Sequence, residues 1–244
     1  MNDELRTLFS RLCGFLLAGV AILFTLAATV YGISGDGELL AREMIRYAPP
    51  ETTGLPAAEY PGAAHMIAAY LTGEEENFQY SFADAEGRVF LCFQSHEADH
   101  MADCRKLILL AGTLRRAAGA AVVVLAGAGI LLRHRRKAFA VGMLAALCVT
   151  GIMITGLVVW AAVNFDGLFV TFHRIAFTND GWLLNPRTDL LIRLMPLDFF
   201  IAMAARLVLW VLAAMAAVGA AAWIMIKTGG NVSGSQRKTV NCEL

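Results

Sequence analysis

Residues 117–163 read AAGAAVVVLAGAGILLRHRRKAFAVGMLAALCVTGIMITGLVVWAAV. Two apolar segments, 117–132 and 139–163, are separated here only by the basic cluster at 133–137. About 20 apolar residues in a helix span a bilayer, so the pattern predicts two transmembrane helices with a very short connection. Short loops rich in Lys and Arg stay on the cytoplasmic side, which places this connection inside the cell.

Two further apolar segments, 12–33 and 199–226, are also long enough to span a bilayer. Hydrophobic residues make up 58% of the 244-residue chain, charged residues only 16%, and mean hydropathy is +0.60. Soluble domains carry about 25% charged residues, so the composition indicates a membrane protein. We therefore predict an all-α membrane protein with four transmembrane helices. Segment 12–33 is longer than the apolar part of a cleaved signal peptide, so we expect it to be retained.

The distribution of Lys and Arg also orients the chain. Arg6 and Arg11 precede the first apolar segment and further basic residues follow the last, so both termini are predicted to be cytoplasmic. Segments 34–116 and 164–198 are then outside. We expect 34–116 to form a small extracytoplasmic cap and 227–244 to form a flexible cytoplasmic tail. The net charge is +0, which excludes the global basic field typical of nucleic-acid-binding proteins.

Local patterns within segment 34–116 predict short elements. Residues 37–47 and 65–71 read as helices, and the first must end before Pro49-Pro50. Apolar and polar residues alternate on both sides of Glu86-Gly87, which predicts a β-hairpin. Ser95 is a preferred N-cap residue for a helix that continues into the second span.

The five cysteines contain no Cys-x-x-Cys metal pattern. Cys13 and Cys148 fall in predicted spans, where cysteine acts as a small apolar side chain. Cys92 and Cys104 both belong to the outer segment, so a disulfide between them and two free thiols are both open.

The sharpest short motif is His96-Glu97-Ala98-Asp99-His100, which matches H-E-x-x-H. In zinc proteases this pattern supplies two His ligands and a Glu base from one helix. A third ligand is needed, and no His or Glu follows at the spacing of soluble zincins. Asp103 is on the same rigid helix and cannot readily complete the site. We favour a chance match, and a membrane zinc protease stays as an alternative prediction.

Residues 172–189, FHRIAFTNDGWLLNPRTD, concentrate polar side chains where the third apolar segment should leave the bilayer. Trp and Phe are common at headgroup depth, so an interfacial loop explains the aromatic residues. It does not explain why His173, Asn179 and Asp189 gather beside them. Titratable groups at a membrane boundary are costly and indicate a functional site.

Two signatures in the chain resemble the lipoprotein intramolecular transacylase (Lit) family of bacterial membrane proteins. The first is Glu97-x-x-His100-Met101-x-Asp103, followed by Lys106-Leu107. The second, longer signature contains Phe172-His173, Phe177, Asn179, Trp182, Leu184, Pro186, Asp189, Leu191-Ile192, Pro196 and Phe199-Phe200. The order of four spans, with a large outer loop after the first, is also similar to that family. Two departures are Asn185, where the family usually has Asp, and the additional His96.

The resemblance implies an acyltransferase of the bacterial cytoplasmic membrane that uses no cofactor and no metal. Its expected partners are diacylglyceryl-modified lipoproteins with a free N-terminal cysteine amine, and membrane phospholipid, but not nucleic acid. The sn-2 acyl chain moves from the glyceryl ester to that amine at the outer face of the membrane, which gives a lyso-form lipoprotein. A non-enzymatic membrane scaffold or transporter is the alternative outside the enzymes.

The resemblance also suggests the catalytic residues. A histidine with a pKa near neutrality can take a proton from the amine and return one to the departing alkoxide. We expect His100 to do this, with Asp103 or Glu97 orienting it. His173 is expected to be a proton shuttle or an oxyanion donor.

Further residues of the two signatures are predicted to bind the substrate. Asn179 and Arg174 are expected to stabilise the developing oxyanion. The remaining members of this group are Phe172, Phe177 and Trp182, which are expected to hold acyl chains or seat the loop in the interface, and Asp189.

Overall fold

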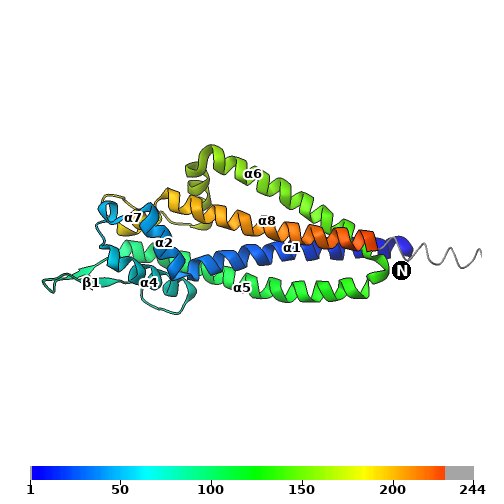
Figure 1. The fold of residues 1–244 in the computed structure, drawn as a ribbon, viewed down its shortest axis with the longest axis horizontal. Helices are drawn as coiled ribbons and strands as arrows, with labels where there is room; N and C mark the ends of the chain where they lie inside the picture. Colours follow the sequence, from blue (N-terminus) through cyan, green and yellow to red (C-terminus); the bar gives the residue numbers. More distant parts are fainter. Residues whose placement is uncertain (1, 229–244) are drawn as a thin grey trace, which may run out of the picture. The chain divides into compact units, whose positions relative to one another are not determined.

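The computed structural model of the protein describes residues 2–228, most of which are helical (Figure 1). In chain order the elements are α1 (Asp3–Gly35), α2 (Gly37–Tyr47), α3 (Pro50–Thr53), the 3₁₀ helix η1 (Ala57–Glu59), α4 (Tyr60–Thr72), β1 (Ser81–Ala83), β2 (Val89–Leu91), α5 (Ser95–Leu131), the 3₁₀ helix η2 (Arg133–Arg135), α6 (Arg136–Ala176), α7 (Leu190–Leu194) and α8 (Leu197–Thr228). Residues 229–244, which contain nearly all of the predicted flexible tail and Cys242, lie outside the described part.

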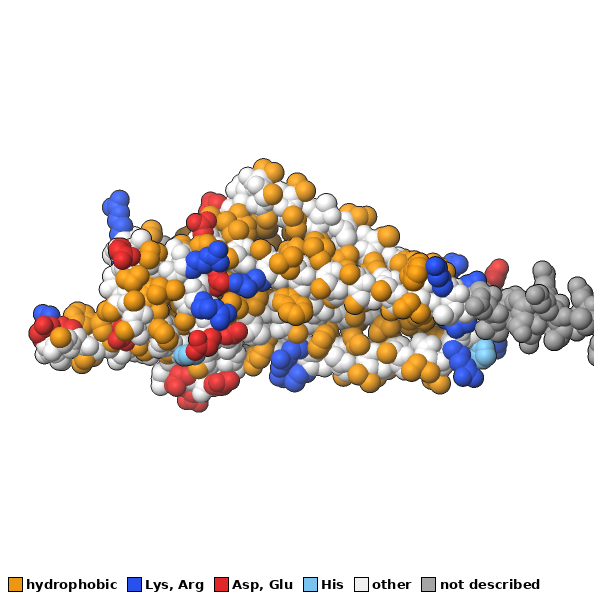
Figure 2. Space-filling model, in the orientation of Figure 1, with side chains coloured by type: hydrophobic (Ala, Val, Ile, Leu, Met, Phe, Trp, Pro, Cys, Tyr) orange, Lys and Arg blue, Asp and Glu red, His pale blue; other side chains and the backbone are white. Residues whose placement is uncertain are grey.

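Four of the described helices, α1, α5, α6 and α8, are long and apolar enough to cross a membrane. Hydrophobic side chains cover much of the surface of these helices in Figure 2. So much exposed apolar surface is unfavourable in water and suits a lipid environment. The prediction of an α-helical, multi-pass membrane protein is confirmed.

The long helices extend beyond the predicted apolar segments. Helix α5 has 37 residues and begins at Ser95, well before segment 117–132. A helix of that length is about 56 Å long, almost twice the roughly 30 Å of the hydrocarbon layer. Backbone hydrogen bonds continue outside lipid, so hydrophobicity does not mark where such a helix begins. The first part of α5, which carries His100 and Asp103, therefore lies outside its apolar segment.

Helix α6 is interrupted at Asn164, where φ is −154° and ψ is 79°. The Asn164 side-chain oxygen accepts a hydrogen bond from the Gly167 amide at 2.8 Å, as an N-cap residue does. The chain therefore starts a new helical stretch at this point and continues to Ala176. This differs from the predicted loop at 164–198, because His173 is held by a helix.

The chain divides into two compact units, and the first contains the chain up to Leu26, Leu114–Leu157 and the chain from Val208 onward. Its buried cluster is formed by Cys13, Ala18, Phe139, Ala140, Met143, Ala146 and Ala222. Two glycines allow the backbones of α1 and α6 to touch. A Cβ on Gly14 would lie 1.9 Å from the Phe139 carbonyl oxygen, and one on Gly142 would lie 1.9 Å from that of Arg11. Small residues serve the same purpose where membrane helices pack closely.

Gly142→Val is expected to lower the thermal stability of the protein, because the added side chain overlaps the α1 backbone. Overpacking typically costs about 1–3 kcal/mol. Gly156→Val is the matched control on the same helix, because a Cβ at Gly156 meets no atom within 4 Å. Melting curves in detergent should show a clearly lower transition temperature for Gly142→Val. Equal transition temperatures for the two variants would contradict the close approach of α1 and α6.

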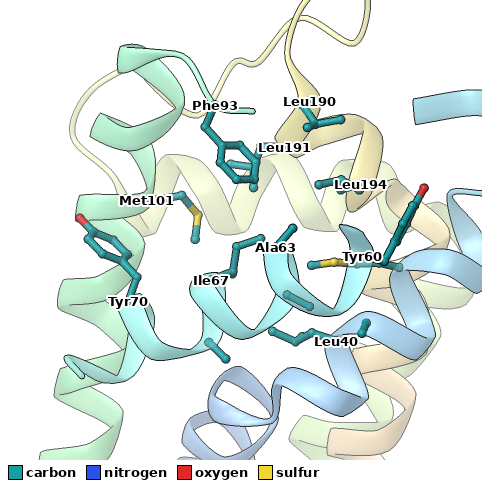
Figure 3. Packing of buried hydrophobic residues seen from close by; sticks show 14 of the residues in the cluster. Leu40, Tyr60, Ala63, Ile67, Tyr70, Phe93, Met101, Leu190, Leu191 and Leu194 are labelled. Carbon is teal, nitrogen blue, oxygen red and sulfur yellow. The ribbon is translucent and has the colours of Figure 1, made fainter. Parts of the chain in front are cut away.

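The second unit comprises Ala27–Thr113 and Val158–Leu207 and has its own hydrophobic core. Figure 3 shows α4 at its centre, with side chains of α2 on one side and of α7 on the other. The labelled members are Leu40, Tyr60, Ala63, Ile67, Tyr70, Phe93, Met101, Leu190, Leu191 and Leu194. This core fixes the beginning of α5 and the helix α7, which both contribute to the site described below.

The short elements predicted between 34 and 116 are present. Helix α2 spans the predicted residues 37–47, and Asp36 caps it by accepting from the Leu39 amide at 2.9 Å. The predicted helix 65–71 forms part of α4. Strands β1 and β2 form the predicted antiparallel hairpin, with Gly87 at φ +77° in its turn. Helix α5 begins at Ser95, the residue predicted as its N-cap, and so starts one residue earlier than predicted.

Candidate active site

Two histidines from the two signatures lie together in the second unit. The ring centroids of His100, on α5, and His173, on α6, are 6.1 Å apart. The two residues are 9% and 7% exposed. The structure therefore brings both predicted catalytic histidines into one buried cluster.

The Glu97 carboxylate fixes the first turn of α5. One oxygen accepts from the Gln94 amide at 2.8 Å, as the third helical residue of a capping box does. The other accepts from the Leu191 amide of α7 at 2.7 Å. Glu97 is 0% exposed, so these two bonds satisfy both oxygens of a fully buried carboxylate. Glu97 thus joins α5 to α7, and its role of orienting His100 stays a prediction.

Aromatic rings enclose His173. Its Nδ1 lies 2.8 Å from the Phe169 carbonyl oxygen, and Phe169 and Trp182 stack at centroid distances of 4.1 and 5.0 Å. Phe177, which is buried, contacts the rings of both histidines. A carbonyl oxygen only accepts hydrogen bonds, so Nδ1 of His173 carries the proton and Nε2 is left as an acceptor. The site therefore presents one histidine with a defined tautomer.

Burial keeps both histidines neutral. Desolvation and, to a smaller extent, the nearby His173 lower the pKa of His100 to about 4, against a smaller opposing effect of Asp103. Desolvation also lowers the pKa of His173, while the hydrogen bond to the Phe169 carbonyl works in the other direction. Both residues lie outside the apolar segments of their helices. At neutral pH the site contains two uncharged imidazoles.

Cys104, one helical turn after His100, was considered in the sequence only as a possible disulfide partner of Cys92. Its Sγ lies 3.5 Å from His100 Nε2, and burial raises the pKa of the thiol to about 12. Such a thiol stays protonated and is a weak nucleophile. Its i, i+4 spacing from His100 was the one signal that could have placed it here. Cys92 and Cys104 are both free, so the structure resolves the open alternative against a disulfide.

Asp103 and Asn179 form the second link between α5 and the segment after α6. Asn179 Nδ2 donates to Asp103 Oδ2 at 2.8 Å, and Lys106 Nζ donates to Oδ1 at 2.8 Å. The hydrogen bond from Lys106, followed by that from Asn179, lowers the pKa of the Asp103 carboxyl. The predicted residues Asp103 and Asn179 are therefore direct partners of each other.

Asp189 organises the chain before α7. It is 2% exposed and accepts from the Asn185 amide at 2.8 Å and from the Thr188 hydroxyl at 2.6 Å. His96 Nε2 lies 2.9 Å from its second oxygen. Desolvation works to raise the pKa of Asp189, but the hydrogen bonds from Thr188, His96 and Asn185 outweigh it and hold that pKa below its usual value. Both oxygens of Asp189 thus have partners within the protein, and its contact with substrate stays a prediction.

The remaining predicted residues differ in exposure. Phe172 is 54% exposed although its ring contacts that of His173. Arg174 is exposed and Trp182 is half-buried. The exposed side chain of Phe172 suits an interface with lipid, as the sequence predicts.

The H-E-x-x-H residues are used in other ways. His96 pairs with Asp189, both Glu97 oxygens accept from backbone amides, and His100 faces His173. Within residues 2–228, no group of three or more His, Cys, Asp or Glu side chains is arranged to hold a metal ion. The three motif residues point to different partners, and this arrangement does not support a zinc site.

His96→Ala is expected to reduce activity by less than about tenfold, because exposed ion pairs contribute less than about 1 kcal/mol. The His96 side chain is 49% exposed, and Asp189 keeps its bonds to Asn185 and Thr188. Metal analysis of the purified protein should show no stoichiometric zinc, and chelators should not inhibit. Bound zinc that disappears in His96→Ala together with activity would restore the protease alternative.

Comparison with known proteins supports the resemblance seen in the sequence. Residues 15–200 match the family described as lipoprotein intramolecular transacylase Lit. A solved structure of the membrane integral lipoprotein intramolecular transacylase Lit from Bacillus cereus aligns with a TM-score of 0.71 at 18% identity, covering 93% of this chain and 98% of that one. A structure of the same Bacillus cereus protein with one histidine replaced by arginine aligns with a TM-score of 0.63 at 20% identity. The alignment covers 93% of this chain and 92% of that one. The comparison with curated proteins gave no match.

The fold and the site define an α-helical, multi-pass integral membrane protein with a buried histidine pair beside an aromatic cluster. The match to the family covers most of the chain, from 15 to 200 of its 244 residues. The chain belongs to the lipoprotein intramolecular transacylase family.

Proposed function

We propose that this protein transfers the sn-2 acyl chain of a diacylglyceryl lipoprotein to the amine of its own N-terminal cysteine. The observation that carries the proposal is the pair of neutral histidines, 6.1 Å apart, in a chain of this family. Donor ester and acceptor amine belong to one molecule, so the enzyme gains most of its rate by holding them in an attack geometry. The product is a lyso-form lipoprotein.

The reaction balances without water, metal or cofactor. The amine nitrogen attacks the sn-2 ester carbonyl carbon and forms a tetrahedral intermediate. The bond from that carbon to the sn-2 oxygen then breaks, and an amide remains. One proton leaves the amine and one is taken up by the sn-2 oxygen, which becomes a hydroxyl group. The protein must therefore accept a proton, stabilise an oxyanion and return the proton.

His173 has the better geometry for moving the proton. Its Nδ1–H is held by the Phe169 carbonyl, so Nε2 can accept the amine proton and later release it to the sn-2 oxygen. An N-terminal amine has a pKa of about 7.7–8.0, so transfer to a group of pKa about 4, such as His100, would be uphill by roughly 5 kcal/mol. We therefore assign the base to His173, which reverses the division of roles expected from the sequence.

His100 is then the hydrogen-bond donor to the oxyanion. A low pKa keeps an imidazole neutral, and a neutral imidazole can donate one N–H to a developing negative charge. Asn179, held by Asp103, joins the segment that follows His173 to α5. Cys104 is not assigned as a nucleophile, because burial holds its thiol protonated.

The test of this function is mass spectrometry of the N-terminal peptide of a reporter lipoprotein. Cells or membranes that contain the protein should yield N-acyl, S-monoacylglyceryl cysteine, and those without it should not. Diacylglyceryl cysteine with an unmodified amine in both samples would refute the proposed function.

We also propose an orientation for the chain. Residues 34–116 form an extracytoplasmic cap between the first and second transmembrane helices, and both termini are cytoplasmic. The basic connection at 133–137, where excess Lys and Arg indicate the inside, supports this orientation. The site is then on the outer face, next to substrate lipoproteins and phospholipid of the bacterial cytoplasmic membrane.

Topology reporters should read this orientation directly. Fusions after Gly54 and after Asp180 are expected to report the outside, and a fusion after Arg136 the inside. A reporter active only in the cytoplasm checks each fusion with the opposite signal. A cytoplasmic signal at Gly54 would contradict the orientation and place the histidine pair on the wrong side for mature lipoproteins.

A further inference from the structure

A cavity of about 290 Å³ in the second unit lies beside the β-hairpin. Phe82, Phe90 and Leu91 of the hairpin line one part of it, and Gln94, Thr188 and Arg193 line another. The rings of Phe82 and Phe90 stack with centroids 5.4 Å apart. His100 and His173 are not among the lining residues, so the cavity is distinct from the candidate active site.

The walls of this cavity are continuous with the active-site segment. Gln94 Nε2 donates to the Thr188 carbonyl at 3.2 Å, and Arg193 Nε donates to the Asp189 carbonyl at 3.3 Å. Asp189 in turn pairs with His96, one helical turn before His100. A ligand in the cavity therefore contacts residues of the segment around Asp189, which is bonded to the first turn of α5.

Among residues 2–228, no strand pairs with the outer edge of β2, so the hairpin offers a free strand edge at the same place. Its two-stranded sheet is bonded through the Cys92 amide to the Tyr80 carbonyl at 2.9 Å and through the Asp84 amide to the Arg88 carbonyl at 3.1 Å. In an antiparallel sheet, every second residue of a strand is hydrogen-bonded to the partner strand. Arg88 and Cys92 are bonded to the other strand of the hairpin, so the backbone groups of Val89 and Leu91 point away from β1. Free edges of this kind bind extended peptides by adding a strand.

We propose that the cavity and the free edge of β2 bind the polypeptide of the lipoprotein substrate, in extended conformation, downstream of its acylated cysteine. This inference rests on the proposed function. In that reaction the acyl chains stay with the lipid and the cysteine amine enters the active site. The polypeptide that follows the cysteine must therefore leave along the surface outside the membrane.

The lining of the cavity suits a peptide better than an acyl chain. It combines apolar groups of Phe90 and Leu91 with polar groups of Gln94, Thr188 and Arg193, whereas an acyl chain prefers a wholly apolar lining. Arg193 uses Nε and Nη1 for two backbone carbonyls. A guanidinium has five N–H donors in total, so donors remain for a peptide carbonyl or carboxylate.

Two synthetic substrates and two variants of the full protein test the proposal. One substrate is S-diacylglyceryl cysteine amide, and the other carries an extension of about eight residues, which reaches roughly 26 Å as a strand. Leu91→Lys places a charge in the cavity. Ala83→Lys is the matched control, because Ala83 is an exposed residue of β1 and belongs neither to the cavity lining nor to the edge of β2.

The measured quantity is the ratio of kcat/KM for the extended substrate to kcat/KM for the minimal one. We expect a ratio well above one for the unmodified protein, a ratio about tenfold lower for Leu91→Lys, and no change for Ala83→Lys. Melting curves should show both variants folded. The proposal is overturned by a ratio of one in the unmodified protein, or by equal ratios for the two variants.

Other outcomes have separate meanings. If Leu91→Lys impairs both substrates equally, the ratio stays constant and the cavity holds an acyl chain instead of the polypeptide, which also overturns the proposal. If the unmodified protein converts neither substrate, the proposed function itself fails and the inference falls with it.

Discussion

His173→Ala is expected to reduce the rate of lyso-lipoprotein formation by about a hundredfold to ten-thousandfold, the usual effect of losing a positioned acid–base group. His100→Ala is expected to reduce the rate by about a hundredfold to a thousandfold, because removal of one oxyanion donor costs about 10²–10³ in kcat. Both variants should still insert and accumulate. The measurement is mass spectrometry of the reporter peptide over time, with variant protein levels equalised.

Glutamine separates the two roles. A glutamine side chain keeps an N–H donor but cannot take up a proton at these pH values. His100→Gln should therefore retain more activity than His100→Ala, and His173→Gln should be as inactive as His173→Ala. The opposite ranking would assign the base to His100, as the sequence first suggested. His65→Ala and His134→Ala are controls with histidines outside the cluster, and near-normal conversion is expected for both.

The pH profile carries the same information. Burial lowers the pKa of both histidines, so each is protonated only below the ordinary value of about 6.5, and His100 only near pH 4. If His173 takes the proton from a bound ammonium group, kcat should stay level as the pH falls from 8 to about 6.5. If the enzyme only positions an already free amine, the rate should fall about tenfold per unit below the amine pKa of about 7.7–8.0.

Composition and charge were enough to predict the four spans, because each signal is local. Apolar length identifies a membrane helix without reference to its neighbours, and α2 was predictable from Asp36 and the prolines that follow it. The match between signatures and family then pointed to the two histidines, although they are 73 positions apart along the sequence (173 − 100). Both predictions used information that is present in contiguous residues.

The rest of the site depends on long-range contacts that no local pattern reveals. The extension of α6 to Ala176 follows a break at Asn164. An asparagine in the sequence does not by itself indicate that a helix begins again at that position. The pairing of Asp189 with His96, and of Asn179 with Asp103, joins residues on different elements. Glu97 was predicted to orient His100 because both residues belong to the first signature. Its side chain points to backbone amides instead, one of them in α7.

Glu97→Ala is expected to destabilise the second unit severely. The substitution leaves the amides of Gln94 and Leu191 without their acceptor, and it creates a void at a side chain that is 0% exposed. An unsatisfied buried donor costs about 1–3 kcal/mol, and this cost applies to the Leu191 amide, whereas Gln94 is exposed and water can replace its acceptor. Total stabilities are about 5–15 kcal/mol, so the loss is a large part of what holds the unit together.

Two measurements distinguish this structural role from the predicted catalytic one. If Glu97 anchors α7 to α5, Glu97→Ala should lower the detergent melting temperature and the activity together. If Glu97 instead orients His100, activity should fall while the melting temperature stays normal. Asp99→Ala is the matched control, because Asp99 is an exposed acidic residue on the same helical turn and should change neither quantity. Normal melting and normal activity for Glu97→Ala would contradict both roles. Since α7 is held by the Leu191 amide bond, the fall in activity should extend to every substrate of the enzyme, including the minimal one.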